Sequence, residues 1–489
     1  MAVIARMLAG HAHTRPDEVA FLDGADGREL TWRSVAAHTH RWRHLARDLP
    51  PRTRIGLVAA DPLAFTAAYL GCLAAGFTAV PVDPRLTAAE LDTTLARLRT
   101  AVVATDRPDV LPGHPTWALE REGPRPVRNV RIRAGGAVAR PAVLLTTSGT
   151  TGAPKGIPLS EWQLVHAARR VARHHRFGPG ERGYTPLPLF HVNAQVMGLL
   201  TTVISGNSLV IDRRFSAGDY WDRVRRWQPT WLNTVPAILA SLAREPAPPD
   251  AVAGRIRFAR SASAPLSRDV QRDFTAHTGI GVLETYGMSE AAGQITANPL
   301  DPLLRRDGSV GLPVEIGLVV TRPDGTEAPP GERGEVRLRG PQVVSQYLEL
   351  DGLGERIRPA RTPDDRLPTG DVGALDEDGY LTLAGRLDDV INRGGEKIYP
   401  QEIEDVLRAH PAVTAVAVVS APDERLGQVP VAFVTGRPDV GLAQALHGWC
   451  AHRLARHKRP AVIEVTPSLP LGPTGKVLRR ELRVEAGRR

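Results

Sequence analysis

The sequence predicts an α/β protein. A large N-terminal domain of βαβ layers carries a small β-rich subdomain, and a small α+β C-terminal domain follows. Up to residue 290, apolar strand-like runs alternate with helical patterns at the spacing of parallel βαβ units. From about residue 310 short strands with Gly, Pro and Asp turns take over. A glycine-rich, charge-dense passage at 385–400 separates these from the last unit, so we predict domains 1–387 and 388–489.

Each element of the large domain is predicted from its apolar pattern and its flanking turns. Strands are expected at 54–60, 77–82, 208–212, 230–234, 255–260 and 280–284. Helices are expected at 69–75, 87–99, 161–174, 217–227, 236–244 and 266–277. The Pro-, Gly- and Arg-rich residues 105–140 are predicted surface connections, prolines exclude a long helix at 186–193, and 285–290 is a predicted turn.

The remaining elements are shorter. The β-rich subdomain is predicted to have strands at 316–321, 334–339 and 380–384. The C-terminal domain is predicted to have helices at 401–409 and 441–456, and strands at 413–419, 430–434 and 461–465.

Composition excludes several classes of protein. A length of 489 residues with 42% hydrophobic content predicts a soluble globular protein, and no apolar run reaches the ~18 residues of a membrane span. Two cysteines and no signal-peptide pattern predict a reducing, cytoplasmic location. The net charge of +9 suggests nucleic-acid binding, but the arginines are dispersed and only 5% of residues are aromatic. We therefore predict no nucleic-acid partner and keep that class as a distant alternative.

Lysine is rare in this chain. Only four of the 62 basic residues are lysines: Lys155, Lys397, Lys458 and Lys476. Three of them lie in Gly-rich segments, where a compact ammonium fits a single cluster of oxygens better than a guanidinium does. Chance placement near glycine is the alternative explanation.

The stretch 145–156 predicts a polyphosphate-binding loop. It follows a short apolar run and combines hydroxyl side chains, glycines and one lysine, L-T-T-S-G-T-T-G-A-P-K-G. The spacing differs from the G-x-x-x-x-G-K-[ST] phosphate loop, and a flexible linker is the alternative. The loops at 146–156, 260–266 and 285–290 all follow predicted strands, so we expect them to converge on one crevice.

Six motifs occur in the order found in adenylate-forming enzymes: T-T-S-G-T-T-G-A-P-K-G (146–156), Y-G-M-S-E (286–290), T-G-D (369–371), G-R-L-D-D (385–389), G-G-E-K-I (394–398) and P-T-G-K (473–476). The chain resembles that superfamily over nearly its whole length. Three further segments, at 187–193, 260–266 and 391–398, resemble stand-alone acid–CoA ligases of the oxalyl-CoA synthetase type. The resemblance implies an AMP-forming ligase that uses ATP, Mg²⁺ and CoA, and a C-terminal domain that is mobile.

The resemblance also implies residue roles. The implied catalytic residues are Lys476, Thr151 and Glu290, of which Glu290 holds Mg²⁺. ATP and AMP are implied to contact Thr147, Ser148, Gly149, Thr150, Gly152, Lys155, Ser263, Ala264, Pro265, Glu284, Thr285, Tyr286, Gly287, Ser289, Asp371 and Arg386. Asp388 matches the hinge between the domains, and the acceptor tunnel is implied to involve Gly394, Gly395, Glu396 and Lys397. Two departures stand out: Ser289 replaces a more frequent threonine, and Ala262 and Ser263 replace frequent glycines.

The implied acyl pocket is polar. By family position it contains His191, Val192, Asn193, Asn233, Arg260 and Ser261. This set predicts a small or polar carboxylic acid, with Arg260 holding the second group of a dicarboxylate, unless Arg260 pairs instead with an acidic neighbour of the protein. Transfer of the acyl group to a carrier-protein thiol or an amine, and activation of an anion such as nitrite, remain alternatives to a carboxylic acid–CoA ligase.

Overall fold

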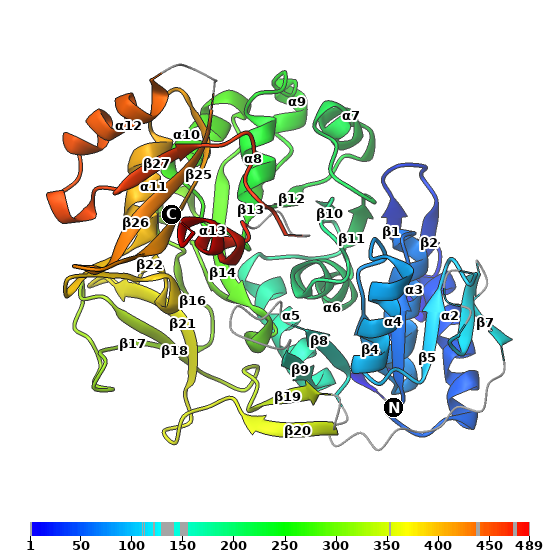
Figure 1. Cartoon of the computed structure of the whole chain (residues 1–489). Helices are drawn as coiled ribbons and strands as arrows, with labels where there is room; N and C mark the ends of the chain where they lie inside the picture. Colours follow the sequence, from blue (N-terminus) through cyan, green and yellow to red (C-terminus); the bar gives the residue numbers. More distant parts are fainter. Residues whose placement is uncertain are drawn as a thin grey trace.

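The computed structural model describes residues 2–109, 111, 113–120, 123–128, 141–146, 155–351, 354–436, 441–472 and 477–488. Within these ranges the strands form two nine-stranded sheets, one four-stranded sheet and one five-stranded sheet (Figure 1). Helices accompany the two large sheets. The predicted α/β class is confirmed.

The first nine-stranded sheet carries the polar residues of the predicted acyl pocket. Its order is β16-β15-β14-β13-β12-β10-β11-β1-β2. The strands are β1 (Val19–Asp23), β2 (Glu29–Thr31), β10 (Arg182–Thr185), β11 (Ser208–Ile211), β12 (Trp231–Thr234), β13 (Phe258–Ser261), β14 (Val282–Met288), β15 (Gly293–Ala297) and β16 (Leu312–Pro313). Strands β1, β11, β10, β12, β13 and β14 run parallel, so their carboxyl ends meet at one edge, where α/β sheets bind ligands.

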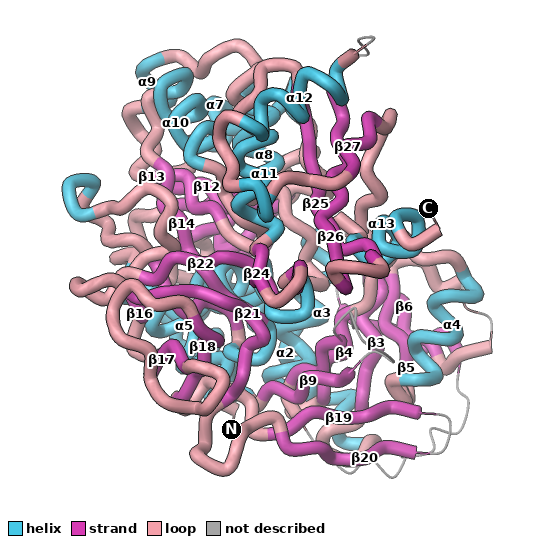
Figure 2. The backbone as a smooth tube through the Cα atoms, turned by 60° about the vertical axis from the view of Figure 1, so that its left-hand side comes forward, coloured by secondary structure: helices cyan, strands magenta, loops and turns pink. Residues whose placement is uncertain are grey.

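The second nine-stranded sheet joins distant parts of the chain. Its order is β20-β19-β9-β8-β4-β3-β5-β6-β7. The strands are β3 (Arg54–Val58), β4 (Thr78–Pro81), β5 (Val102–Thr105), β6 (Thr116–Glu120), β7 (Gly123–Arg128), β8 (Val143–Thr146), β9 (Lys155–Leu159), β19 (Gln346–Asp351) and β20 (Gly354–Pro359). Strand β19 lies beside β9, which brings the β-rich part of the chain next to Lys155 (Figure 2).

Two sequence predictions are wrong in these sheets. Residues 105–140 are not only surface connections, because β6 and β7 form there. Trp117 is buried in the core, and the prolines of β7 are tolerated because β7 is an edge strand. The predicted turn at 285–290 is also wrong, because β14 continues to Met288 and pairs with β15.

Helices fill the space between and around the sheets. They are α1 (Val3–Thr14), α2 (Trp32–Leu45), α3 (Pro62–Ala75), α4 (Ala88–Arg97), α5 (Glu161–His174), α6 (Thr201–Ser205), α7 (Ala217–Trp227), α8 (Pro236–Leu242), α9 (Asp250–Ala253) and α10 (Arg268–Thr278), with short turns η1 (Ala46–Asp48) and η4 (Pro302–Leu304). Helix α3 contacts β1 of one sheet and β3 and β4 of the other, so it lies between them. It starts earlier than predicted, because Asp61 caps its first turn and Pro62 occupies the first helical position.

An unpredicted π-helix, η2 (Asn193–Leu200), follows the proline-rich segment and runs directly into α6. The backbone hydrogen bonds of a π-helix span one residue more than those of an α-helix, and such π segments are frequent at functional sites. Asn193, its first residue, therefore stands at the end of the segment that the sequence predicted to be non-helical.

The four-stranded sheet contains β17 (Gly317–Thr321), β18 (Gly334–Arg339), β21 (Leu367–Leu375) and β22 (Leu381–Arg386). After the turn η5 (Leu387–Asp389) comes the five-stranded sheet of β23 (Ile391–Arg393), β24 (Glu396–Ile398), β25 (Val413–Asp423), β26 (Gly427–Gly436) and β27 (Val462–Val465). Its helices are α11 (Pro400–Arg408), α12 (Leu442–Ala451) and α13 (Arg479–Ala486), with η6 (Arg456–Lys458). Helix α12 is shorter than predicted, and α13 was not predicted.

The apolar core is divided between these regions. Two clusters contain buried residues no later than Leu381, and two others contain buried residues from Ile391 onward. The turn η5 lies between the two sets. The division into domains 1–387 and 388–489 stays a prediction.

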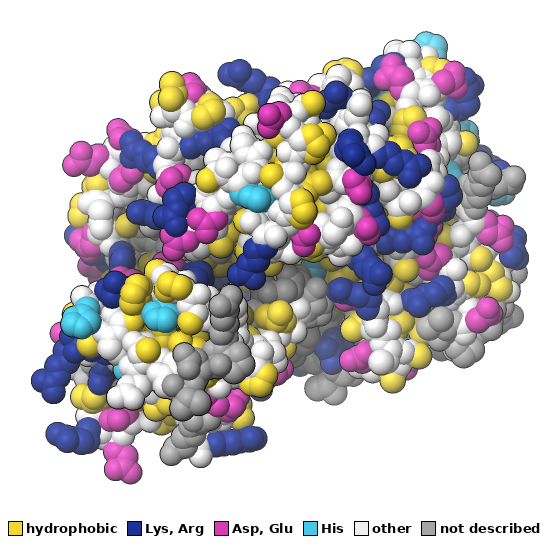
Figure 3. All heavy atoms as spheres, turned by 90° about the horizontal axis from the view of Figure 1, so that it is seen from above, with side chains coloured by type: hydrophobic (Ala, Val, Ile, Leu, Met, Phe, Trp, Pro, Cys, Tyr) yellow, Lys and Arg dark blue, Asp and Glu magenta, His cyan; other side chains and the backbone are white. Residues whose placement is uncertain are grey.

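The surface carries its basic residues in separate groups. In the face seen in Figure 3, Lys and Arg side chains are scattered, and many have Asp or Glu beside them. Among the described residues, no helix combines the length and the apolar character that a membrane crossing requires.

Candidate active site

Three predicted nucleotide contacts form one cluster at the junction of β14, β21 and β22. The hydroxyl of Tyr286 donates to Asp371 Oδ2 at 2.5 Å, and Arg386 Nη1 donates to Asp371 Oδ1 at 2.9 Å. Asp371 and Arg386 face each other in the β21–β22 register, and the Asp371 N–H donates to Thr369 Oγ1. The carboxylate of Asp371 is thereby held rigidly beside a nearly buried aromatic ring.

A second cluster surrounds Glu290. Its carboxyl accepts a hydrogen bond from Tyr347 of β19, and its pKa is raised, mainly by burial. The positive charge of Lys155 acts against this rise, and Lys155 Nζ lies 5.4 Å from the centre of the Tyr347 ring. The β9–β19 pairing thus brings Tyr347 and Lys155 together at the edge of the segment predicted to bind phosphates, and Tyr347 links them to the carboxyl of Glu290.

The strand between these clusters is tightly packed. A Cβ on Gly287 would lie 2.2 Å from the carbonyl oxygen of Gly293, so only glycine fits there. Thr285 is buried and donates to the carbonyl of Ser261 on the neighbouring strand. Ser289 follows the strand in the turn η3 (Ser289–Ala291), and it is half-buried.

Glu284 is a buried carboxyl without an ion pair among the described residues. Its side chain is 6% exposed, and Oε2 has no hydrogen-bond partner in the described part of the chain. Burial raises its pKa to about 8, although the backbone N–H of Leu266 donates to the carboxyl. That N–H belongs to the loop after β13, which also contains Ser263, Ala264 and Pro265, all exposed.

Arg260 organises the predicted acyl pocket. It is 3% exposed, and its Nη1 donates to Asn193 Oδ1 at 3.0 Å and to Asn233 Oδ1 at 3.1 Å. Among the described residues no carboxylate pairs with it, and its Nε has no partner. Burial lowers its pKa to about 9. In the described part of the chain, Arg260 does not form the ion pair with an acidic neighbour that the sequence left open as an alternative.

The other predicted pocket residues lie around this arginine. His191 and Val192 are half-buried at the start of η2, and Ser261 is buried on β13 with its hydroxyl unpartnered among the described residues. Behind Arg260, at the end of α5, the pKa values of His174 and His175 are lowered by burial and by the arginine charge. Among the described residues, burial is the cause of the lowered Arg260 pKa, and no acidic side chain opposes it.

Several predicted residues lie outside the described ranges: Thr147, Ser148, Gly149, Thr150, Thr151, Gly152 and Lys476. Strands β8 and β9 flank the first six of them and pair antiparallel, with Thr146 opposite Gly156.

The predicted acceptor residues lie on a hairpin of another sheet. Strands β23 and β24 are joined by Gly394 and Gly395, whose φ angles of +59° and +95° suit a two-residue turn between right-twisted strands. Glu396 and Lys397 follow, and both are exposed.

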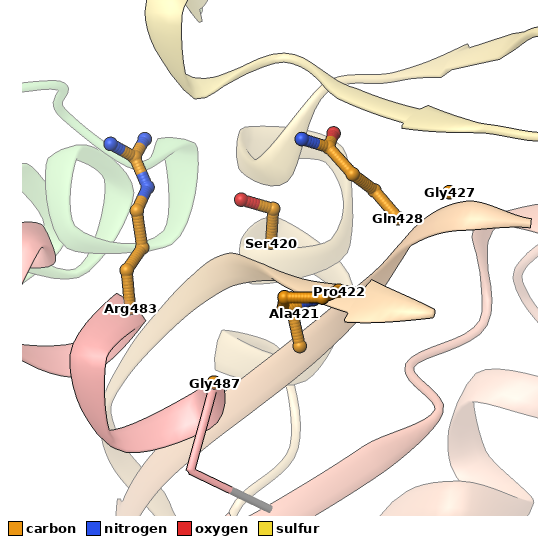
Figure 4. Close-up of a pocket in the computed structure, with 7 residues that line it drawn as sticks. All are labelled: Ser420, Ala421, Pro422, Gly427, Gln428, Arg483 and Gly487. Atoms are coloured by element: carbon orange, nitrogen blue, oxygen red, sulfur yellow. The ribbon is translucent and has the colours of Figure 1, made fainter. Parts of the chain in front are cut away.

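Asp388, the predicted hinge residue, is tied to the C-terminal helix. Arg483 Nη2 donates to the Asp388 carbonyl at 3.1 Å and to the Asp389 carboxylate. Next to this contact, a surface pocket of about 290 Å³ is lined by residues of β25, β26 and the C-terminal end of the chain around α13. Figure 4 shows Arg483, Ser420 and Gln428 extending toward the same side of this pocket.

Two family models match this chain. The profile of the AMP-binding enzyme matches residues 8–348, and that of the AMP-binding enzyme C-terminal domain matches residues 402–476. The chain belongs to the AMP-binding enzyme family. The two matches confirm the predicted resemblance to adenylate-forming enzymes.

Its relatives include several CoA ligases. The sulfoacetate–CoA ligase of Cupriavidus necator is 43% identical over 343 residues, which are 70% of this chain and 66% of that protein. The oxalate–CoA ligase of Arabidopsis thaliana is 33% identical, over 69% of this chain and 66% of that protein. The feruloyl-CoA synthase of an Amycolatopsis species is 30% identical, over 94% and 95%. The match thus spans slightly less than two thirds of the first two relatives and nearly all of the third.

Solved structures resemble the whole chain. ATP-bound MatB from Rhodopseudomonas palustris superposes with a TM-score of 0.87 at 27% identity and covers 99% of each chain. The o-succinylbenzoate CoA synthetase of Bacillus subtilis, in complex with its acyl-adenylate intermediate, has a TM-score of 0.83 at 27% identity over 98% and 97%. These likenesses confirm the predicted large N-terminal and smaller C-terminal parts of the fold.

Sequence reasoning missed some members of the site. Tyr347 contacts both Glu290 and Lys155, but it lies on β19, whose pairing with β9 has no local signal. Thr185 accepts a hydrogen bond from Asn233 Nδ2 at 3.3 Å from the end of β10, a strand that was not predicted.

Proposed function

We propose that this chain is an AMP-forming acid–CoA ligase that activates a small carboxylic acid carrying a second anionic group. The observation that carries the choice of acid is Arg260, a buried guanidinium held by two amide oxygens and, among the described residues, paired with no carboxylate. A buried charge without a partner is expensive unless a ligand supplies the partner. A carboxylate or sulfonate on the substrate has the required charge and fits the donors of the guanidinium.

The two reactions follow from the family and the chemistry of the substrates. A carboxylate oxygen of the acid attacks the α-phosphorus of ATP, the bond to the β-phosphate oxygen breaks, and pyrophosphate leaves. The thiol sulfur of CoA then attacks the acyl carbon, the thiol proton passes to solvent, and AMP leaves. The relatives named as CoA ligases support CoA as the acceptor; a carrier-protein thiol or an amine is the alternative that the assay below separates.

The nucleotide is proposed to lie over β14 and the ends of β21 and β22. Asp371, fixed by Tyr286 and Arg386, offers carboxylate oxygens for the ribose hydroxyls. Lys155 is proposed to contact phosphate oxygens, together with the loop 147–154. Lys476 is proposed from its motif to bridge the acid and the α-phosphate.

The residues present also fit a magnesium ion. Mg²⁺ binds nucleotides through one or two carboxylates, phosphate oxygens and water rather than a full protein cage. The described residues contain no group of three or more His, Cys, Asp or Glu that could hold a metal alone. Glu290 is the carboxylate we propose for it, because its burial favours a neutral form unless a cation lies nearby. The ion would neutralise phosphate charge as pyrophosphate leaves.

Three further parts of the sequence predictions enter this proposal. We propose the domain boundary at 387/388, with Asp388 at a hinge and the Gly394–Lys397 hairpin at the acceptor tunnel. The C-terminal domain is proposed to be mobile and to present Lys476 for the first reaction and the hairpin for the second. A cytoplasmic location is supported by two cysteines, both free and buried.

ATP–pyrophosphate exchange tests the proposal. The acids should include oxalate, malonate and sulfoacetate, with acetate as the control that lacks the second anion. We expect exchange with at least one dianionic acid to exceed that with acetate by at least about 100-fold, because a site built around a buried charge rejects an analogue that leaves it unpaired. Addition of CoA, a carrier protein or an amine then identifies the acceptor. Equal exchange with acetate, or no acid-dependent exchange, would contradict the proposal.

A further inference from the structure

The side-chain amide of Asn193 connects two parts of the proposed site. On one side its Oδ1 accepts hydrogen bonds from Arg260 Nη1 at 3.0 Å and from Asn233 Nδ2 at 3.4 Å. On the other side its Nδ2 donates to Ser263 Oγ at 3.1 Å. Because an amide group is planar and rigid, a shift of its oxygen also shifts its nitrogen. The acid subsite and the loop after β13 are therefore in direct mechanical contact.

Ser263 is held in an unusual backbone conformation. Its φ angle is +72°, in the left-handed region, which is energetically unfavourable for residues with a Cβ. Its side chain is exposed, so packing contributes little to holding it there. The free-energy cost of the left-handed conformation is comparable to the free energy that one hydrogen bond contributes to stability. The bond from Asn193 is thus strong enough to decide between this conformation and a relaxed one.

The loop that Ser263 begins also reaches the nucleotide side. Ser263, Ala264 and Pro265 are proposed nucleotide contacts, and the N–H of Leu266 donates to the Glu284 carboxyl. A change at Ser263 therefore alters the wall against which the nucleotide is proposed to bind.

Binding of an anion changes the hydrogen bond between Arg260 and Asn193. In the empty site Arg260 has only the two amide oxygens as acceptors among the described residues. An anionic group offers the guanidinium stronger acceptors, and Arg260 then binds the amide oxygen of Asn193 less strongly. Asn193, whose Nδ2 already donates to Ser263 Oγ, can then strengthen this hydrogen bond, which stabilises the left-handed conformation of the loop.

We propose that Asn193 and Ser263 couple the two substrates, so that an anionic group at Arg260 strengthens the binding of ATP, and ATP strengthens the binding of the acid. This inference rests on the proposed function and adds a positioning role for the Ser263 hydroxyl. The coupling is reciprocal, because the same free-energy difference links both binding events.

Calorimetry on the full chain tests the coupling. The acid that gives the strongest exchange among oxalate, malonate and sulfoacetate is titrated with and without saturating α,β-methylene-ATP and Mg²⁺. For the unmodified protein we expect the nucleotide to lower the Kd of the acid by about tenfold, the middle of the usual range of coupling between sites. In Ser263→Ala the ratio of the two Kd values should fall below about two, whatever the Kd for the acid alone.

Ser267→Ala is the matched control. Ser267 lies in the same loop, and its hydroxyl caps α10 by accepting from the Val270 N–H at 3.2 Å. Its loss disturbs the loop and the helix but leaves the Asn193–Ser263 bond, so the tenfold ratio should remain. Ser263→Gly is a second variant that relieves the backbone strain as well, and it should also lose the coupling.

The outcomes separate this inference from the proposed function. If both ligands bind the unmodified protein but independently, or if Ser263→Ala keeps the full ratio, the coupling is refuted while the ligase proposal stands. If Ser267→Ala loses as much coupling as Ser263→Ala, loop stability is the cause and the role of Asn193 is refuted. If neither ligand binds, the proposed function fails, and this inference fails with it.

Discussion

Replacement of Arg260 by methionine should stabilise the ligand-free protein. A pKa lowered from 12.5 to about 9 corresponds to a cost of about 5 kcal/mol for keeping the charge buried. A base whose folded-state pKa lies below its unfolded value destabilises the fold fully at every pH below the folded pKa, so the whole cost is present at pH 7. Methionine removes the charge at similar volume, but it also removes the two hydrogen bonds to Asn193 and Asn233, worth together about 3 kcal/mol. The expected net gain is about 2 kcal/mol.

Urea unfolding at pH 7, followed by tryptophan fluorescence, measures this gain. Arg170→Met is the matched control, because Arg170 is 2% exposed, none of its guanidinium nitrogens has a partner among the described residues, and burial lowers its pKa to about 10. Both variants should be more stable than the unmodified protein. Only Arg260→Met should fail to gain further stability when a dianionic acid is added, since a ligand stabilises only a fold that binds it.

A loss of stability in Arg260→Met would refute the reasoning. It would mean that the guanidinium is a structural member of the core, whose hydrogen bonds outweigh its desolvation. Equal stabilisation of Arg260→Met and the unmodified protein by the acid would place the anion elsewhere.

Four other substitutions give distinct results. The pKa of Glu284 is raised from 4.5 to about 8, so the unmodified protein should lose stability as the pH rises through this window. Urea unfolding should show a loss of about 3 kcal/mol between pH 5.5 and 8.5 in the unmodified protein and no such loss in Glu284→Gln. Glu290→Gln should raise the Mg²⁺ concentration for half-maximal pyrophosphate exchange at least about tenfold, because the amide lacks the charge that binds the ion; an unchanged magnesium requirement would remove Glu290 from that role. Asn193→Asp should neutralise Arg260 within the protein and weaken the binding of dianionic acids by about 100-fold in calorimetry while raising stability; tighter acid binding would contradict the subsite. Arg483→Ala should free α13 from η5 and change the rate of thioester formation from supplied acyl-adenylate more than the rate of pyrophosphate exchange; equal effects would argue against a hinge there.

Local patterns predicted the parallel part of the fold well. The strands at 230–234, 255–260 and 280–284 correspond to β12, β13 and β14, and their carboxyl ends lie side by side. Such strands are short apolar runs bounded by turns, and neighbouring βαβ units pair in order. The residues that follow them therefore came together as expected.

Long-range pairing was beyond sequence reasoning. The register of β19 against β9, with Glu349 opposite Lys155, joins strands nearly 200 residues apart and depends on the whole sheet. For the same reason Tyr347 could not be assigned to the site. The sequence also could not predict whether Arg260 has an acidic partner, because composition does not show which carboxylates the fold brings near a given arginine.

The buried guanidinium of Arg260 and the buried carboxyl of Glu284, neither of which has an ion-pair partner among the described residues, occupy opposite faces of the first sheet. In the β13–β14 register Arg260 lies opposite Leu283, and Ser261 lies opposite Glu284. Successive side chains of a strand point to opposite faces, so Arg260 and Glu284 are separated by the thickness of the sheet although their strands are adjacent. A direct ion pair would have satisfied both groups and closed the site to ligands. Their separation leaves a cation on the acid side and a carboxyl on the nucleotide side, and the loop after β13 is linked to both, through the Asn193–Ser263 hydrogen bond and the Leu266 N–H.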